Sequence, residues 1–105
     1  MKVRDRDARP AGLRFEWSAS KARLNAEKHG VTFDEAATAF RDPLARIFDD
    51  PVHSSGDHRE LLVGHSRRAR LIIVSFAERD DGRVRIISAR QTTRRERREY
   101  EQGTR

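Results

Sequence analysis

The chain has 105 residues, the size of one domain, and its 35% of hydrophobic residues can build a small core but not a large enclosed ligand cavity. It contains no cysteine, which excludes disulfide bonds and thiolate chemistry. It also has neither an apolar run of about 20 residues nor a signal-peptide core, so we expect a cytoplasmic protein without a membrane partner. The formal net charge is +6, an excess typical of proteins that bind a polyanion.

The excess of positive charge is confined to one part of the chain. Residues 59–98 hold twelve arginines and five acidic residues, whereas bases and acids balance in residues 1–58. The planar guanidinium group binds phosphate with two parallel hydrogen bonds, which the lysine ammonium cannot do. Clustered arginine therefore predicts a nucleic-acid partner for the second half of the chain.

The first half of the chain predicts a disordered tail, a short extended segment and two helices. The tail covers residues 1–12, and apolar residues alternate with polar ones at 13–17. A helix is expected at 19–29, with Ser18 as N-cap and Gly30 as C-terminal glycine. A second helix is expected from residue 33 to 41, with Thr32 and Glu35 forming a capping box, and with Asp42-Pro43 ending it.

The second half predicts strands and a last helix. Strands are expected at 44–48, 59–66, 70–78 and 83–90, with a loop at 49–57, a tight connection at 67–69 and a hairpin turn at 80–82. Thr93 and Glu96 form the capping box of a helix that ends near Tyr100. The fold class is therefore α+β: a small antiparallel sheet of three to four strands, two N-terminal helices and one C-terminal helix, with the helices on one face. Residues 13–101 are predicted to form one domain, followed by a tail at 102–105.

Several motifs, taken in order, resemble those of a known family. The first half carries Phe15-Glu16-Trp17, then Lys21, Asn25 and Lys28-His29-Gly30, followed by Thr32-Phe33-Asp34-Glu35-Ala36 and Phe40-Arg41-Asp42-Pro43. The second half carries Gly64-His65-Ser66, the run from Arg85 to Arg97, and Tyr100-Glu101. Over about residues 15–101 the chain resembles the BrnT family of bacterial toxins. Ser18 stands where that family commonly has aspartate, and both residues are good N-caps.

The resemblance implies a fold, an activity and partners. The fold would be RelE-like, and the activity that of a metal-independent endoribonuclease that inhibits translation and needs no cofactor. The partners would be an RNA substrate and a BrnA-like ribbon-helix-helix antitoxin that neutralises the toxin. Operator DNA would be bound through the toxin–antitoxin complex.

RNA cleavage without a metal uses the 2′-hydroxyl group as nucleophile, and it needs a base, an acid and cations around the phosphate. Arg85 is the first candidate, because an arginine within a strand is costly unless it faces solvent or a ligand. The candidate catalytic residues are Arg85, Arg70, Lys21, His65 and Glu78. The candidate RNA-binding residues are Lys28, Arg79, Arg83, Arg90 and Arg94.

Structural alternatives remain open for several of these residues. Glu78 can pair with a cross-strand arginine, His29 can cap its helix, and the charged run 92–101 can be a solvated helix rather than an RNA or antitoxin contact. His53 and His58 are expected in a solvated loop, and no metal site is predicted. The alternative functions are a non-catalytic nucleic-acid-binding module or corepressor, and an interaction protein whose arginines meet an acidic partner.

Overall fold

The computed structural model describes residues 13–50 and 58–103. The elements in chain order are β1 (Phe15–Glu16), α1 (Ala19–His29), α2 (Phe33–Thr38), the 3-10 helix η2 (Ala39–Arg41), β2 (Arg46–Asp49), β3 (Arg59–His65), β4 (Leu71–Glu78), β5 (Val84–Gln91) and α3 (Arg94–Glu101). The predicted tail at 1–12 and residues 51–57 of the predicted loop lie outside the described residues. Within the described residues, no helix is long and apolar enough to cross a membrane.

The helix boundaries follow the predicted caps. The Ser18 hydroxyl accepts a hydrogen bond from the Lys21 N–H, and Gly30 ends α1 with a φ of 69°. Thr93 and Glu96 form the predicted capping box of α3. The second helix is shorter than predicted, because the α-helical hydrogen bonds end at Thr38 and the chain tightens into η2.

The sheet has five strands in the order β1-β5-β4-β3-β2, so the prediction of three to four strands was too low. Strands β2 to β5 are antiparallel as predicted, but β1 runs parallel to β5, and the sheet is therefore mixed. In β1 only two residues pair, Phe15 with Val84 and Glu16 with Arg85. A two-residue strand has no periodicity that could reveal its partner from sequence.

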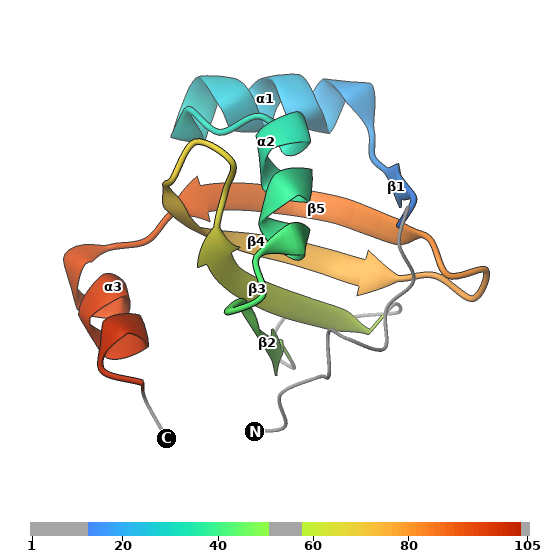
Figure 1. Ribbon diagram of the computed structural model, residues 1–105. Coiled ribbons are helices and arrows are strands. Elements are labelled where there is room, and N and C mark those ends of the chain that lie inside the picture. The colour runs from blue at the N-terminus through green and yellow to red at the C-terminus, as the bar shows by residue number, and fades with distance from the viewer. Residues whose placement is uncertain (1–12, 51–57, 104–105) are drawn as a thin grey trace.

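The two faces of the sheet differ. On one face α2 crosses the strands, while α1 runs along β5 (Figure 1). The core lies there, with Phe15, Phe40 and Phe76 in successive edge-to-face contacts. Its fully buried side chains include Val31, Phe33, Ile47, Leu62, Ile72, Val74, Val84 and Ile86.

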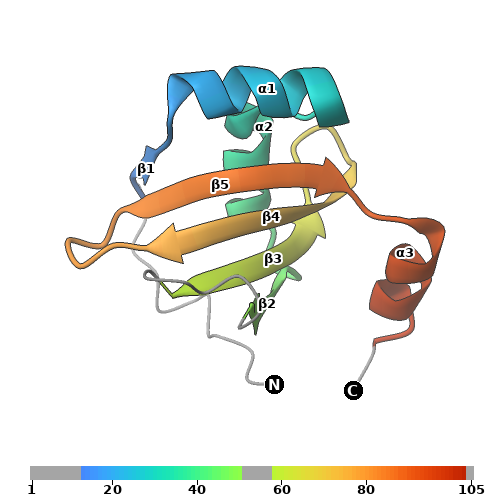
Figure 2. The same cartoon turned by 180° about the vertical axis from the view of Figure 1, so that it is seen from behind.

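We call the opposite face, seen in Figure 2, the outer face. Its row nearest α3 is Arg46, Val63, Ile73 and Arg90, which are cross-strand partners. The next row contains Phe48, Leu61 and Ser75. Helix α3 contributes Glu96, Glu99 and Tyr100 to the lining of this face, so the prediction that every helix covers the same face was wrong for α3.

Candidate nucleic-acid interface

A groove follows the outer face beside α3. It consists of two adjoining hollows that share Ile73 and Glu96. Between Ser75 and Phe76 of β4 the register with β5 shifts, and the resulting bulge turns both Ile87 and Ser88 toward the groove. Half-buried apolar side chains of the strands thus form the floor. Its charged lining residues are three arginines and three acids: Arg46, Arg59 and Arg90, and Asp50, Glu96 and Glu99.

His65 lies at one end of the outer face, where β3 ends. Its Nδ1 is 3.4 Å from Oδ2 of Asp42, and the same oxygen accepts a 2.7 Å hydrogen bond from the His65 backbone N–H. The Asp42 side chain is only 10% exposed, whereas that of His65 is 43% exposed. A fixed carboxylate beside Nδ1 favours the proton on that nitrogen, which leaves Nε2 to accept a proton from a ligand.

Tyr100 contacts both His65 and Arg46. The two rings stand edge to face with centroids 5.9 Å apart, and Cζ of Arg46 lies 5.1 Å from the Tyr100 ring centroid. The Tyr100 hydroxyl donates a 2.9 Å hydrogen bond to the carbonyl of Leu44. Burial and the nearby Asp42 raise the pKa of Tyr100, so the phenol stays protonated at neutral pH. His65, Asp42, Tyr100 and Arg46 form what we call the histidine cluster.

Arg90, a predicted RNA-binding residue, is held by α3. Its guanidinium group donates hydrogen bonds of 2.8 and 2.9 Å to the two carboxylate oxygens of Glu96. The bonds from Arg90, followed by the Thr93 backbone N–H, lower the pKa of Glu96 to about 2. Glu96 is therefore ionised at neutral pH, and it neutralises Arg90 within the groove.

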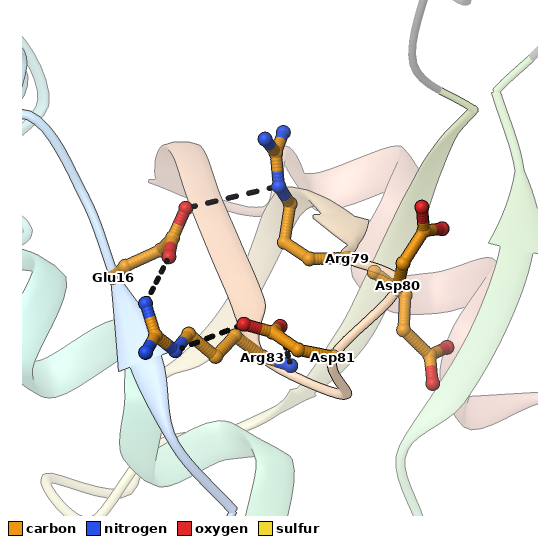
Figure 3. A pocket seen from close by; sticks show the side chains of 6 residues that line it. Glu16, Arg79, Asp80, Asp81 and Arg83 are labelled. Atoms are coloured by element: carbon orange, nitrogen blue, oxygen red, sulfur yellow. Dashed lines mark hydrogen bonds and ion pairs between the residues drawn. The ribbon is translucent and has the colours of Figure 1, made fainter.

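The predicted arginines of the hairpin end surround one carboxylate. Glu16 lies 3.4 Å from Arg85, 3.6 Å from Arg83 and 3.9 Å from Arg79. Figure 3 shows the contacts with Arg79 and Arg83, and Arg83 also meets Asp81 at 3.2 Å. The hollow at this end is lined by Glu16, Glu78, Arg79, Asp80, Asp81 and Arg83. Four acids and two arginines make its lining negative, which does not favour RNA phosphate.

Arg70 lies away from the hairpin, against the helices. Its side chain is 23% exposed and forms a bidentate ion pair with Glu35, and it also donates a 3.0 Å hydrogen bond to the Gly30 carbonyl. Hydrogen bonds from Arg70 lower the pKa of Glu35. The predicted capping box at Thr32 is therefore only half formed: the Thr32 hydroxyl accepts from the Glu35 N–H, but the Glu35 carboxylate serves Arg70 and Ser66.

The remaining candidates are exposed on helices. Lys21 and Lys28 lie on α1, and Arg94 is the first residue of α3. Asn25, which lies between the two lysines in α1, is buried against β5.

The predicted site residues thus fall into separate groups. Glu78, Arg79, Arg83 and Arg85 gather at the hairpin end, and His65 lies at the opposite end of the sheet. Sequence reasoning missed Asp42 and Arg46 as partners of His65, and it did not connect Tyr100 with His65. No local signal joins these residues, because loop, strand and helix bring them together from 58 positions apart in the chain.

One group of side chains could hold a cation. Ligand atoms of Asp49, His58 and Glu60 all lie within 4.8 Å of one another. His58 precedes β3 and His65 ends it, so the two are separated by about 20 Å of extended chain. An ion at Asp49, His58 and Glu60 would therefore not contact the histidine cluster.

Comparison with known proteins bears on this arrangement. No curated protein sequence matches the chain. The crystal structure of the Brucella abortus ribonuclease toxin BrnT matches with a TM-score of 0.62 and 21% sequence identity, over 78% of this chain and 99% of that chain. This likeness concerns the fold. The family described as "Ribonuclease toxin, BrnT, of type II toxin-antitoxin system" matches residues 17–96, most of the chain. The chain therefore belongs to the BrnT family of ribonuclease toxins from type II toxin–antitoxin systems.

Proposed function

We propose that this chain is a metal-independent endoribonuclease that inhibits translation in the cytoplasm, with His65 transferring the proton. The observation that carries the proposal is the 3.4 Å contact between Nδ1 of the half-exposed His65 and the buried Asp42 carboxylate. A histidine held in this way is suited to general acid–base catalysis.

In the proposed reaction, Nε2 of His65 removes the proton of a ribose 2′-hydroxyl group. The 2′-oxygen then attacks the adjacent phosphorus and the bond to the 5′-oxygen breaks. A general acid gives a proton to the leaving 5′-oxygen. The products are a 2′,3′-cyclic phosphate and a 5′-hydroxyl. Arg46, close to His65 through Tyr100, would stabilise the charge on the phosphorane.

Arg85 is the second residue that we propose for phosphate binding. It lies on the outer face in register with Ala77 and Arg59, and its side chain is 36% exposed. Its 3.4 Å contact with Glu16 is long for a charged hydrogen bond, so a phosphate could displace the carboxylate.

The first experiment measures cleavage of a defined RNA by purified wild type, His65→Gln and His58→Gln. His58 is the matched control, because it is an exposed histidine that also contacts an aspartate, at the other end of β3. We expect His65→Gln to lower kcat by about 100-fold and His58→Gln to leave it unchanged. EDTA is expected to have no effect on the wild type. Full activity of a folded His65→Gln variant would refute the role of His65, and loss of cleavage in EDTA would refute metal independence.

A second experiment follows growth and total RNA after induction of the chain alone, beside Arg85→Ala. Early growth arrest with RNA loss, relieved in a folded Arg85→Ala variant, would support the ribonuclease. Normal growth with well-expressed wild type would favour the alternative of a non-catalytic nucleic-acid-binding module or corepressor.

We further propose that a BrnA-like ribbon-helix-helix antitoxin neutralises the chain, and that the complex of both binds operator DNA. The supporting observation is membership of a type II toxin–antitoxin family. Coexpression with the product of a short adjacent reading frame is expected to restore growth and to yield a complex that shifts its own promoter DNA. A chain that stays toxic beside that product would contradict this part.

A further inference from the structure

The turn between β3 and β4 carries three arginines that the proposed reaction does not use. We call residues 66–70 the arginine turn. Arg70 points inward and pairs with Glu35, whereas Arg67 and Arg68 are exposed, with the Arg68 side chain 68% exposed. The nearest acidic partner of Arg68 is the same Glu35, at 3.9 Å. One buried carboxylate thus faces two guanidinium groups, and the turn keeps a positive charge.

The backbone of the arginine turn is tightly held. The Arg67 N–H donates to the Thr38 hydroxyl at 2.8 Å, and the Arg68 N–H donates to the Ser66 hydroxyl at 3.2 Å. The Ser66 hydroxyl in turn donates to Glu35 at 2.7 Å. Ala69 adopts a φ of 62°, which is uncommon for a residue with a side chain and persists where the surroundings fix it. The two exposed arginines are therefore displayed from a preorganised base.

Further positive side chains gather around the arginine turn. Arg70 donates a hydrogen bond to the carbonyl of Gly30, and Gly30 lies two residues after Lys28. The N–H of Thr92, which lies two residues before Arg94, donates to the carbonyl of Leu71, the residue that follows Arg70. Figure 1 shows the end of α1, the β3–β4 turn and the start of α3 at the same end of the molecule, opposite the β4–β5 hairpin. We call Lys28, Arg67, Arg68 and Arg94, all exposed, the basic end.

We propose that the basic end binds the phosphate backbone of the RNA that flanks the cleaved bond. This inference rests on the proposed function, which places the cleaved bond at His65. His65 immediately precedes Ser66, the first residue of the arginine turn. An RNA strand with one ribose at His65 would pass directly over Arg67 and Arg68. Guanidinium groups bind phosphate without reading the base, so the contact strengthens binding to long RNA irrespective of sequence.

The test measures binding of a 20-nucleotide RNA whose 2′-hydroxyl groups are methylated, so that cleavage cannot occur. Arg67→Gln/Arg68→Gln is compared with Arg14→Gln/Arg23→Gln, a control with the same charge loss at exposed positions away from the turn. We expect about tenfold weaker binding for the turn variant, a salt dependence shallower by about 1.4 in log–log slope, and a much smaller change for the control. Equal effects of the two double variants would overturn the proposal.

Cleavage kinetics separate this surface from the reacting groups. On a long RNA the turn variant is expected to raise KM about tenfold with kcat unchanged, and on a trinucleotide neither constant should change. A lower kcat on the trinucleotide would overturn the proposal, since it would place the turn in the chemical step. If the wild type binds the methylated RNA as described but cleaves no RNA, the proposed function fails while the basic end stands.

Discussion

Asn25 shows how one side chain completes the edge of the sheet. Strand β1 pairs only with Val84 and Arg85, so it does not cover the later part of β5. There the Asn25 amide takes the place of a strand: it accepts a 3.1 Å hydrogen bond from the Ala89 N–H and donates a 2.8 Å bond to the Ala89 carbonyl. It also donates a 2.9 Å bond to the Val31 carbonyl, so the residue joins α1, β5 and the start of α2.

Replacing Asn25 by alanine should therefore be costly. The change leaves buried backbone groups of Ala89 and Val31 without their partner, and each such group costs about 1–3 kcal/mol. We expect the free energy of unfolding to fall by about 2–4 kcal/mol, measured by urea denaturation. Lys21→Ala, at an exposed position of the same helix, is the control and should change it by less than about 0.5 kcal/mol. Similar values for the two variants would show that the hydrogen bonds contribute little.

Glu96 gives the stability a defined pH dependence. Its pKa is about 2 in the folded protein, against 4.5 for an ordinary glutamate, so its contribution to stability is fully present above about pH 4.5 and is lost as the pH falls toward 2. Because the Arg90 and Glu96 side chains are 42% and 32% exposed, we expect only about 1 kcal/mol from this pair. Between pH 6 and pH 2.5, the free energy of unfolding of Glu96→Gln should therefore fall by about 1 kcal/mol less than that of the wild type. Thermal or urea unfolding at the two pH values measures the difference. Glu99→Gln, which also removes one carboxylate from α3, is the control.

At the scale of elements, Gly64 allows η2 and β2 to approach β3. A Cβ atom at this position would lie 2.8 Å from Cβ of Ala45 and 3.3 Å from Oδ2 of Asp42. Gly64→Ala should thus destabilise the protein by about 1–3 kcal/mol, and it should lower RNA cleavage by shifting Asp42 away from His65. Ala45→Gly removes the closer atom, so the double variant is expected to recover part of both losses. A double variant no better than Gly64→Ala would show that Ala45 is not the obstacle.

The elements that were predicted correctly are those whose signals are local. Ser18, Gly30 and the Thr93–Glu96 pair fix helix ends through contacts within a few residues, so the sequence alone placed α1 and α3. Glu35 carries the same local signal as Glu96, but its carboxylate pairs with Arg70, 35 positions away. The Glu35 carboxylate binds the charged, half-buried Arg70 more strongly than the backbone N–H of Thr32, and no local pattern reveals that competition.

The histidine cluster could not be predicted for the same reason. His65 was a candidate because of its residue type, but its partners belong to the loop before β2, to β2 and to α3. Arg85 was expected to face solvent or a ligand; it lies on the outer face, but it is not among the residues that line the two hollows of the groove. Its neighbour Glu16 comes from β1, whose parallel pairing with β5 had no sequence signal.

At the scale of the whole molecule, the placement of the carboxylates gives the two ends of the sheet different charges. Glu16 holds three arginines at the hairpin end, where Asp80 and Asp81 add further negative charge, whereas the basic end has Glu35 as its buried acid. The molecule is therefore polarised although its net charge is positive. In a field of this kind a nucleic acid is steered toward the basic end.

Glu16→Gln tests this division. The change should release Arg85 onto the outer face and make the hairpin end less negative, so RNA binds more tightly and with a steeper salt dependence, by about 0.7 in log–log slope for each arginine that gains a phosphate. Glu27→Gln, at an exposed position of α1, raises the net charge by the same amount without releasing a paired arginine, and it should leave the slope nearly unchanged. Fluorescence anisotropy of a methylated RNA between 50 and about 300 mM salt measures both. Identical slopes for the two variants would mean that net charge, rather than the placement of the carboxylates, governs RNA binding.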